Sequence, residues 1–178
     1  MKPIVQEGDP VLREIAQPIP EQMFGSKELD QMLLDMIESL DAAPDGVALA
    51  APQIGLPYRI FVVRYDRTLP PPLEDEAARV PDIGVFINPV FVKSSRRQEE
   101  MDEGCLSVRN IYGKTQRFIR ATVRARTANG STFERGGGGL LAQIFQHEID
   151  HLDGILFIDH AYDTYELRRG TSETANHE

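Results

Sequence analysis

Two stretches of the chain place apolar residues at helical spacing. In residues 27–41 leucine, methionine and isoleucine recur every three or four positions, and Ser26 stands where an N-cap is expected. Residues 140–152 show the same periodicity, after four glycines at 136–139 and before Gly154, which is placed to end the helix. The pattern therefore predicts one helix in the first third of the chain and another near its C-terminal end.

Other segments have the shorter periodicity of strands. The predicted strands, with a hairpin turn at Asn129-Gly130 before the last, are 59–64, 84–92 with an interruption at Asn88-Pro89, 118–126, and 131–134. In 118–126 arginine and threonine alternate with small apolar residues, so Arg120, Arg124 and Arg126 share one face. We interpret this face as solvated; an anionic partner is the alternative.

The predicted elements, spread over 178 residues, are those of a single domain that mixes helices and strands. Residues 68–83 interrupt the pattern with a proline-rich, acidic segment, which we interpret as a surface loop. Residues 170–178 are polar and are expected to fray. We therefore predict one domain over residues 1–169, followed by a polar tail.

Composition narrows the class of protein. A hydrophobic content of 41% is that of an ordinary globular protein, and 19 basic against 28 acidic residues give a net charge of −9, which argues against nucleic-acid binding. A single cysteine excludes an internal disulfide framework. The N-terminus has no apolar signal-peptide run, and no segment approaches the roughly 18 apolar residues of a membrane span. These features predict a cytoplasmic protein in a reducing compartment, away from membranes.

The C-terminal helix carries the strongest chemical signal. At about 100° per residue, His147 and His151 fall in the same sector as Leu140 and Ile144, inside the apolar stripe. A metal ion gives both buried rings a partner, and Glu148 lies beside them as a general base for a bound water. A His-Glu-x-x-His pattern arises by chance roughly once per hundred such chains. The alternative is a pair of core histidines that are satisfied by hydrogen bonds.

A site with two histidines needs a third ligand, and Cys105 is one candidate. Taken alone, a single buried cysteine is more often a small hydrophobic residue. The extended protease motif would need a third histidine where this chain has Phe157. A glutamate further along, Glu166 or Glu173, would instead give the ligand set of a metalloendopeptidase. The two remaining histidines, which we interpret as surface residues, are His160 and His177.

Residues 46–53 form a third notable segment, which is small and apolar and ends in Gln53. In one interpretation it is a tight loop whose small residues only let backbones pack. In the other it is a wall along which a peptide backbone passes, with Gln53 donating to an oxyanion.

Taken together, three motifs resemble those of the peptide deformylases. That family carries Gly-x-Gly-x-Ala-Ala-x-Gln, Glu-Gly-Cys-Leu-Ser and Gln-His-Glu-x-Asp-His, and similar segments stand here in the same order at 46–53, 103–107 and 146–151. The resemblance extends over roughly residues 3–160. It implies an α+β fold in which antiparallel strands surround a central metal-binding helix.

The resemblance also implies a reaction. Cys105, His147 and His151 would hold a divalent metal tetrahedrally with a water as fourth ligand; the ion is usually Fe²⁺, while Zn²⁺, Ni²⁺ and Co²⁺ fit as well. Glu148 would accept the proton of that water, and the hydroxide would attack the formyl carbon of an N-formylmethionyl nascent peptide. Glu148 would then return the proton to the leaving amine, which releases formate. Docking at the ribosome is expected because the substrate emerges there.

Further roles follow from the same resemblance. The oxyanion would be met by the backbone N–H of Leu106 and the side-chain amide of Gln53. The peptide backbone would pair with the edge around Val47 and Ala48, and the methionine side chain would enter an apolar pocket. The positions expected to bind substrate are Val47, Ala48, Met101, Glu103, Gly104, Leu140 and Ile144. Asp150 would either orient a metal ligand or face outward.

Two positions depart from the family pattern. Ala48 replaces the second glycine of the first motif, and Arg109 stands where many relatives have proline. Both lie beside the expected peptide track, so they put its contacts in question. They leave the ligands, Glu148 and Gln53 untouched, and we expect an active enzyme. A non-catalytic metal protein, in which Glu148 is dispensable, is the remaining alternative.

Overall fold

The computed structural model describes residues 1–70 and 79–167. Their helices and strands, in chain order, are α1 Lys27–Asp41, β1 Ala48–Ala50, β2 Ile60–Arg64, β3 Ile83–Ser94, β4 Gln98–Cys105, β5 Val108–Phe118, β6 Arg120–Arg126, β7 Thr132–Gly138, α2 Leu140–Leu152 and β8 Tyr162–Glu166. Short 3-10 helices lie between them, among them η3 Ala51–Ile54. Residues 71–78, the middle of the predicted loop at 68–83, and the predicted tail at 170–178 lie outside the described residues.

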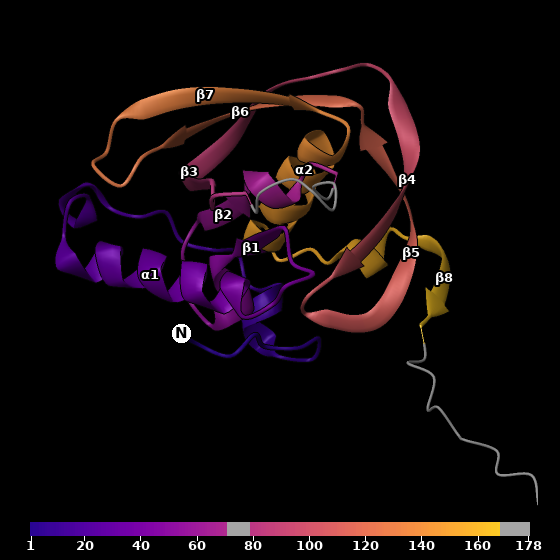
Figure 1. Ribbon diagram of the computed structural model, residues 1–178, viewed down its shortest axis with the longest axis horizontal. Coiled ribbons are helices and arrows are strands. Elements are labelled where there is room, and N and C mark those ends of the chain that lie inside the picture. Colours follow the sequence, from indigo (N-terminus) through magenta and orange to yellow (C-terminus); the bar gives the residue numbers. More distant parts are fainter. Residues whose placement is uncertain (71–78, 168–178) are drawn as a thin grey trace, which may run out of the picture.

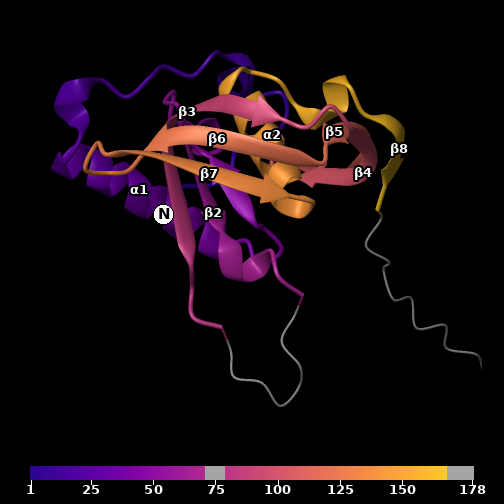
Figure 2. The same cartoon turned by 90° about the horizontal axis from the view of Figure 1, so that it is seen from above.

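The strands form two antiparallel sheets with α2 between them. One sheet has the order β1-β2-β3-β6-β7 and the other the order β4-β5-β8. Helix α2 contacts β1, β6 and β7 of the first sheet and β5 of the second (Figure 1). Figure 2 shows β3, β6 and β7 side by side, with β8 at the end where β4 and β5 lie. This arrangement confirms the predicted α+β fold with antiparallel strands around a central helix.

Strand β2 divides two hydrophobic cores, because both faces of its sheet are covered. Phe61 and Val63 point into the core that contains α2, where the ring of Phe61 stacks on that of Phe86 at 4.4 Å. Ile60 and Val62 point into the core that contains α1. A strand covered on both faces is apolar at nearly every position, which explains the continuous run predicted as a strand at 59–64.

Both predicted helices are confirmed, with their ends. The Ser26 side chain accepts a hydrogen bond from the backbone N–H of Leu29 at 3.2 Å, which satisfies one of the free donors of the first turn of α1. Helix α2 ends at Leu152, and Gly154 adopts the left-handed conformation with φ 75° two residues later. The last helix therefore ends just before the glycine that was predicted to terminate it.

The predicted strands are longer and more numerous in the structure. The segment 118–126 was predicted as one strand, but β5 ends at Phe118 and β6 begins at Arg120. Strand β3 also continues through the predicted interruption, because the irregularity at Asn88 is a β-bulge, with φ 51°. The Asn88 side chain stabilises the bulge by hydrogen bonds with the backbone N–H and C=O of Ile19. Within β6 the alternation is confirmed: the arginines lie outside, and Arg124 pairs with Glu134.

The glycines at 136–138, which precede the helix, belong to β7. Gly137 pairs with Ala121 of β6, and a Cβ at Gly137 would lie 2.7 Å from the Leu141 side chain. Helix α2 therefore starts in direct contact with the strand that precedes it. No helix among the described residues is long and apolar enough to cross a membrane.

Candidate active site

Helix α2 brings two histidines to the point where β4 ends. His147 and His151 lie one helical turn apart, with ring centroids separated by 4.8 Å. Cys105 closes β4, and its Sγ lies 3.2 Å from Nε2 of His151. One nitrogen or sulfur atom from each of these three side chains lies within 4.8 Å of the others. Among the His, Cys, Asp and Glu side chains of the described residues, these three are the one group whose ligand atoms are close enough to share a metal ion.

Two donors face the sulfur of Cys105. The backbone N–H of Ser107 points at it from 3.4 Å, and the side-chain amide of Gln53 lies 3.5 Å away. Both groups therefore lie on the side of the sulfur that faces η3 and Ser107. Gln53 itself is buried in η3, and its Oε1 accepts from the backbone N–H of Ala50 at 2.8 Å. Its NH₂ group is thereby turned toward Cys105.

Glu103 holds His147 from the strand side of the site. Its carboxylate accepts from Nδ1 of His147 at 2.5 Å, from Arg117 at 2.6 and 2.9 Å, and from the Thr115 hydroxyl at 2.6 Å. Burial raises the pKa of Glu103, but the contacts with His147 and Arg117 outweigh it and hold the pKa far below its usual range. With Nδ1 bonded in this way, His147 presents Nε2 to the centre of the site.

Glu148 is the opposite case. Its side chain is 3% exposed, and its Oε2 has no hydrogen-bond partner among the described residues. Burial raises the pKa of Glu148 to about 7. Nδ1 of the buried His151 is likewise without a partner among the described residues, and burial lowers the pKa of His151 well below its usual range. The unpartnered Oε2 of Glu148 beside three nitrogen and sulfur ligand atoms fits a site that holds a divalent metal.

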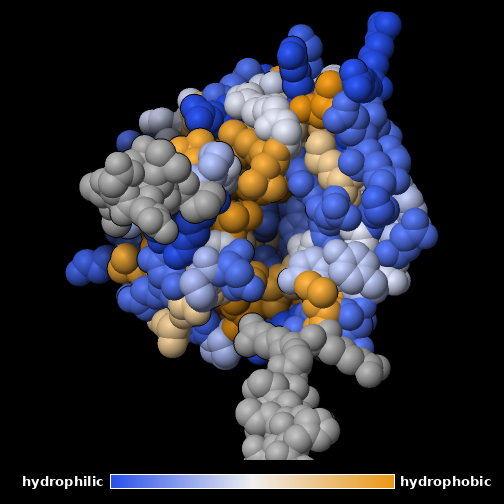
Figure 3. Space-filling model, turned by 45° about the vertical axis from the view of Figure 1, so that its right-hand side comes forward, coloured by the Kyte–Doolittle hydropathy of each residue, from blue (hydrophilic) through white to orange (hydrophobic). Residues whose placement is uncertain are grey.

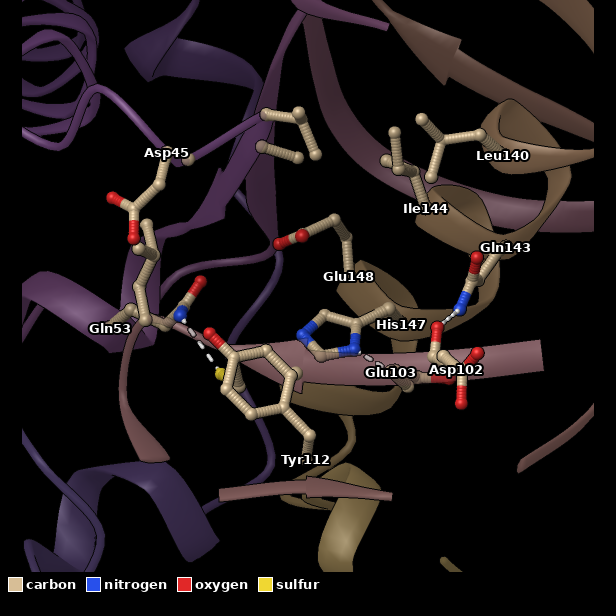
Figure 4. Close-up of a pocket in the computed structure, with 16 residues that line it drawn as sticks. Asp45, Gln53, Asp102, Glu103, Tyr112, Leu140, Gln143, Ile144, His147 and Glu148 are labelled. Atoms are coloured by element: carbon tan, nitrogen blue, oxygen red, sulfur yellow. Dashed lines mark hydrogen bonds and ion pairs between the residues drawn. The ribbon is translucent and has the colours of Figure 1, made fainter. Parts of the chain in front are cut away.

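These residues surround a cleft of about 250 Å³ between α2, β4 and the segment before η3. The surface on the side of β4 and β5 is hollowed, with apolar side chains along the rim (Figure 3). Figure 4 shows Leu140 and Ile144 on the α2 side of the cleft, Glu148 and His147 in its floor, and Gln53 across from them. The predicted substrate-binding residues that line the cleft are Val47, Ala48, Glu103, Gly104, Leu140 and Ile144.

The other expected positions are distributed as follows. Leu106 also lines the cleft, whereas Met101 is not part of its lining. Asp150 reaches no ligand directly, but accepts from Arg117 at 2.7 Å and so supports Glu103 from behind. Arg109 is exposed and lies outside the cleft lining, while Ala48 is 7% exposed and forms part of it.

The alternative ligands lie elsewhere. Glu166 is at the end of β8, where it pairs with Ile111, and does not belong to the metal-site group. Glu173 and His177 are outside the described residues. His160 is exposed, as predicted, with Nε2 4.0 Å from Asp150. The described part of the chain therefore offers Cys105 as the third donor.

Sequence reasoning gave no role to two side chains that support the site, Thr115 and Arg117, and it named Tyr112 only as part of a segment that borders the substrate in the family that the chain resembles. Thr115 and Arg117 reach Glu103 from alternate positions of β5, and Tyr112 lines the cleft from the same strand. The only local signal for the first two was a polar alternation at the end of a segment that had not been predicted as a strand. Their function depends on the register of β5 against β4, which places Met101 opposite Thr115 and Glu99 opposite Arg117.

Known proteins share both the sequence and the fold. The profile of a family described as polypeptide deformylase matches residues 1–166. A peptide deformylase of Acidobacterium capsulatum is 43% identical over 158 residues, which cover 89% of this chain and 85% of that protein. A peptide deformylase from Legionella pneumophila superposes with a TM-score of 0.78 at 35% identity, over 92% of this chain and 87% of that one. A class I type b peptide deformylase from Acinetobacter baumannii, in a Met-Ala-Ser-bound crystal structure, superposes with a TM-score of 0.77 at 31% identity. The match covers 90% of this chain and 99% of that one.

Proposed function

Because the chain belongs to the peptide deformylase family, and so is a hydrolase that removes N-formyl groups from nascent peptides, we propose how its own residues divide this reaction. The observation that carries the proposal is the unpartnered carboxylate oxygen of Glu148 beside the donors of Cys105, His147 and His151. Work on nascent chains further supports a cytoplasmic location and an encounter with substrate at the ribosome.

Cys105, His147 and His151 would hold the metal, with Fe²⁺ as the proposed ion and Zn²⁺, Ni²⁺ or Co²⁺ as substitutes. A divalent metal in this position supplies a Lewis acid, which acidifies water and polarises the formyl oxygen. The protein sets the geometry through Glu103, which orients His147, and through the donors that face the sulfur of Cys105.

Glu148 is the proposed proton carrier. Its Oε2 has no partner among the described residues, and burial raises its pKa to about 7 in the metal-free site, so the side chain offers a free oxygen with an increased affinity for a proton. We assign it two steps: it takes the proton of the attacking water, and it gives that proton to the nitrogen of the departing methionine. The bond between the formyl carbon and that nitrogen breaks, and formate is released.

Gln53 and Leu106 are the proposed oxyanion donors. The Gln53 carbonyl is held by the backbone N–H of Ala50, which leaves its NH₂ group directed toward Ser107 and Cys105 at the cleft wall. One N–H bond reaches Ser107 and the other faces the sulfur of Cys105, and we propose that the second turns to the formyl oxygen when substrate binds. The backbone N–H of Leu106 follows directly after the cysteine and lines the same wall.

The substrate backbone is expected to lie between two sheet edges. Strand β1 is the last strand of the five-stranded sheet and β4 is the last of the three-stranded sheet, and residues of both line the cleft. An extended peptide satisfies such free edges by adding a strand to them. Leu140 and Ile144, on the α2 side, then form the apolar surface for the methionine side chain.

The deciding experiment measures formate release from formyl-Met-Ala-Ser by the protein loaded with Fe²⁺ without oxygen. We expect steady turnover, and we expect Cys105→Ser to lose both bound metal and activity. A fully metallated protein that releases no formate would overturn the proposal. If Cys105→Ser kept its metal, the third ligand would have to be another residue, as in the metalloendopeptidase alternative.

A further inference from the structure

Tyr112 is a cleft residue to which the proposed reaction gives no role. It stands in the middle of β5 opposite Gly104 of β4, and both residues line the cleft. A Cβ at Gly104 would lie 2.6 Å from Cε1 of Tyr112, so the ring occupies the space that any other residue would fill. In Figure 4 the ring lies on the side of the cleft away from Leu140 and Ile144. Gly104 therefore lets an aromatic ring lie against the edge strand.

Strand β8 fixes this ring from its other side. Tyr165 is the register partner of Tyr112, and the two rings stack with centroids 5.9 Å apart and planes at 22°. Tyr112 is thus placed between Gly104 and Tyr165 on one face of the three-stranded sheet. A ring held between two neighbours loses little conformational freedom on binding a ligand, which makes it an effective contact surface.

The alternation of β4 decides which part of a substrate meets this ring. Successive side chains of a strand point to opposite faces, and Glu103 points toward His147 on α2, so Gly104 and its partner Tyr112 belong to the opposite face. A peptide that extends the sheet along β4 alternates in the same way. If its first side chain points to Leu140 and Ile144 on α2, its second points to the face of Tyr112.

We propose that Tyr112 is a specificity-determining residue that contacts the side chain following the formylmethionine and favours an aromatic residue there. The proposal rests on the proposed function, and it adds a preference for the second residue of the substrate. Offset or edge-to-face pairs of aromatic rings contribute about 0.5–1.5 kcal/mol beyond their buried area, which corresponds to a preference of roughly 2- to 12-fold. Such a preference acts on binding more than on the chemical step.

The test compares two substrates, formyl-Met-Phe amide and formyl-Met-Ala amide, with the full-length protein loaded with Fe²⁺. We expect the wild type to have a higher kcat/KM for the phenylalanine substrate. In Tyr112→Ala we expect that ratio to fall by about 2- to 12-fold, mainly through KM, while Tyr112→Phe keeps it. Tyr112→Leu, which preserves bulk in the strand, replaces the alanine variant if the latter does not fold.

Two variants on β8 serve as a matched pair. Tyr165→Ala removes the ring that backs Tyr112, and we expect it to lower the ratio part of the way. Tyr162→Ala removes a tyrosine from the same strand that does not line the cleft, and we expect no change in the ratio.

The outcomes are separable. The role of Tyr112 would be overturned if the wild type showed no preference, or if Tyr112→Ala left the ratio of kcat/KM values unchanged. It would also be overturned if Tyr112→Ala lowered kcat/KM equally for both substrates, because an equal loss is expected of a purely structural residue. A well-metallated wild type that releases formate from neither substrate would overturn the proposed function itself.

Discussion

Two buried glutamates on opposite sides of His147 show how differently one cleft treats the same side chain. Glu103, 5% exposed, comes from β4 and is met by donors from His147, Arg117 and Thr115. Glu148, 3% exposed, comes from α2, and one of its oxygens has no partner. The pKa of Glu103 is far below its usual range, whereas burial raises that of Glu148 to about 7.

The difference arises from the supply of donors, since burial is nearly equal. Adjacent strands can aim several side chains of one face at a single carboxylate, as β5 does with Thr115 and Arg117. A helix turned toward a cleft offers its side chains no such neighbours. The strand side therefore yields a permanent anion that positions a histidine, and the helix side yields a group that exchanges protons near neutral pH.

The largest expected effect comes from removing the exchangeable proton. Glu148→Gln keeps the size and burial of the side chain but cannot accept a proton, and we expect kcat to fall by about 10²- to 10⁴-fold. Metal content should stay at the wild-type level, because Glu148 is not among the three donors of the metal-site group. Formate release and metal analysis on the same sample measure both. A loss of less than tenfold would move the proton transfer to another group.

The second effect comes from removing the permanent anion. Glu103→Gln keeps the shape but weakens the hold on His147 and leaves Arg117 with Asp150 as its remaining carboxylate partner. We expect metal affinity to fall by about 10- to 100-fold. The free energy of unfolding should fall by about 3–5 kcal/mol, as when one member of a buried ion pair is removed.

Chelator competition and chemical denaturation measure the two quantities for Glu103→Gln. Thr115→Val is the matched control, because it removes one uncharged donor to the same carboxylate and leaves Arg117 in place. We expect a loss of about 1.5–3 kcal/mol and a smaller change in affinity. Should Glu103→Gln bind metal as tightly as the wild type, Glu103 would have no part in positioning His147.

The residues that α2 contributes to the site could be predicted from the sequence. The spacing of His147 and His151 depends only on the geometry of one helix, and the apolar stripe showed that both rings face inward. Cys105 lies 46 positions before His151, so no local pattern decides whether it joins the site. The spacing alone left it between a ligand and a small core residue, and the resemblance to the deformylases was needed to choose.

The contacts that β4 and β5 contribute to the site could not be predicted in the same way. Strand β4 is mostly acidic and polar, and it carries no apolar alternation because much of its sheet faces solvent. Glu103 could be named from the family motif, but its partners Thr115 and Arg117 are set by the register of two strands. Register is a long-range property of the fold, which explains why a strand of this composition and its contacts escaped prediction.

The smallest expected effect is on the free energy of unfolding, to which the two glutamates contribute in opposite ways as the pH changes. In the metal-free protein the folded-state pKa of Glu148, about 7, lies above its unfolded value of 4.5, so the folded state binds more protons between these values. Its contribution, about 3 kcal/mol, is complete below pH 4.5 and is lost as the pH rises toward 7. Glu103, with a lowered pKa, contributes above pH 4.5 and loses its contribution as the pH falls below it.

Chemical denaturation of the metal-free wild type and of Glu148→Gln at pH 5 and pH 7.5 isolates the contribution of Glu148. We expect the wild type to lose stability relative to the variant across this interval; equal changes in both would mean that Glu148 does not hold a proton more tightly in the folded state.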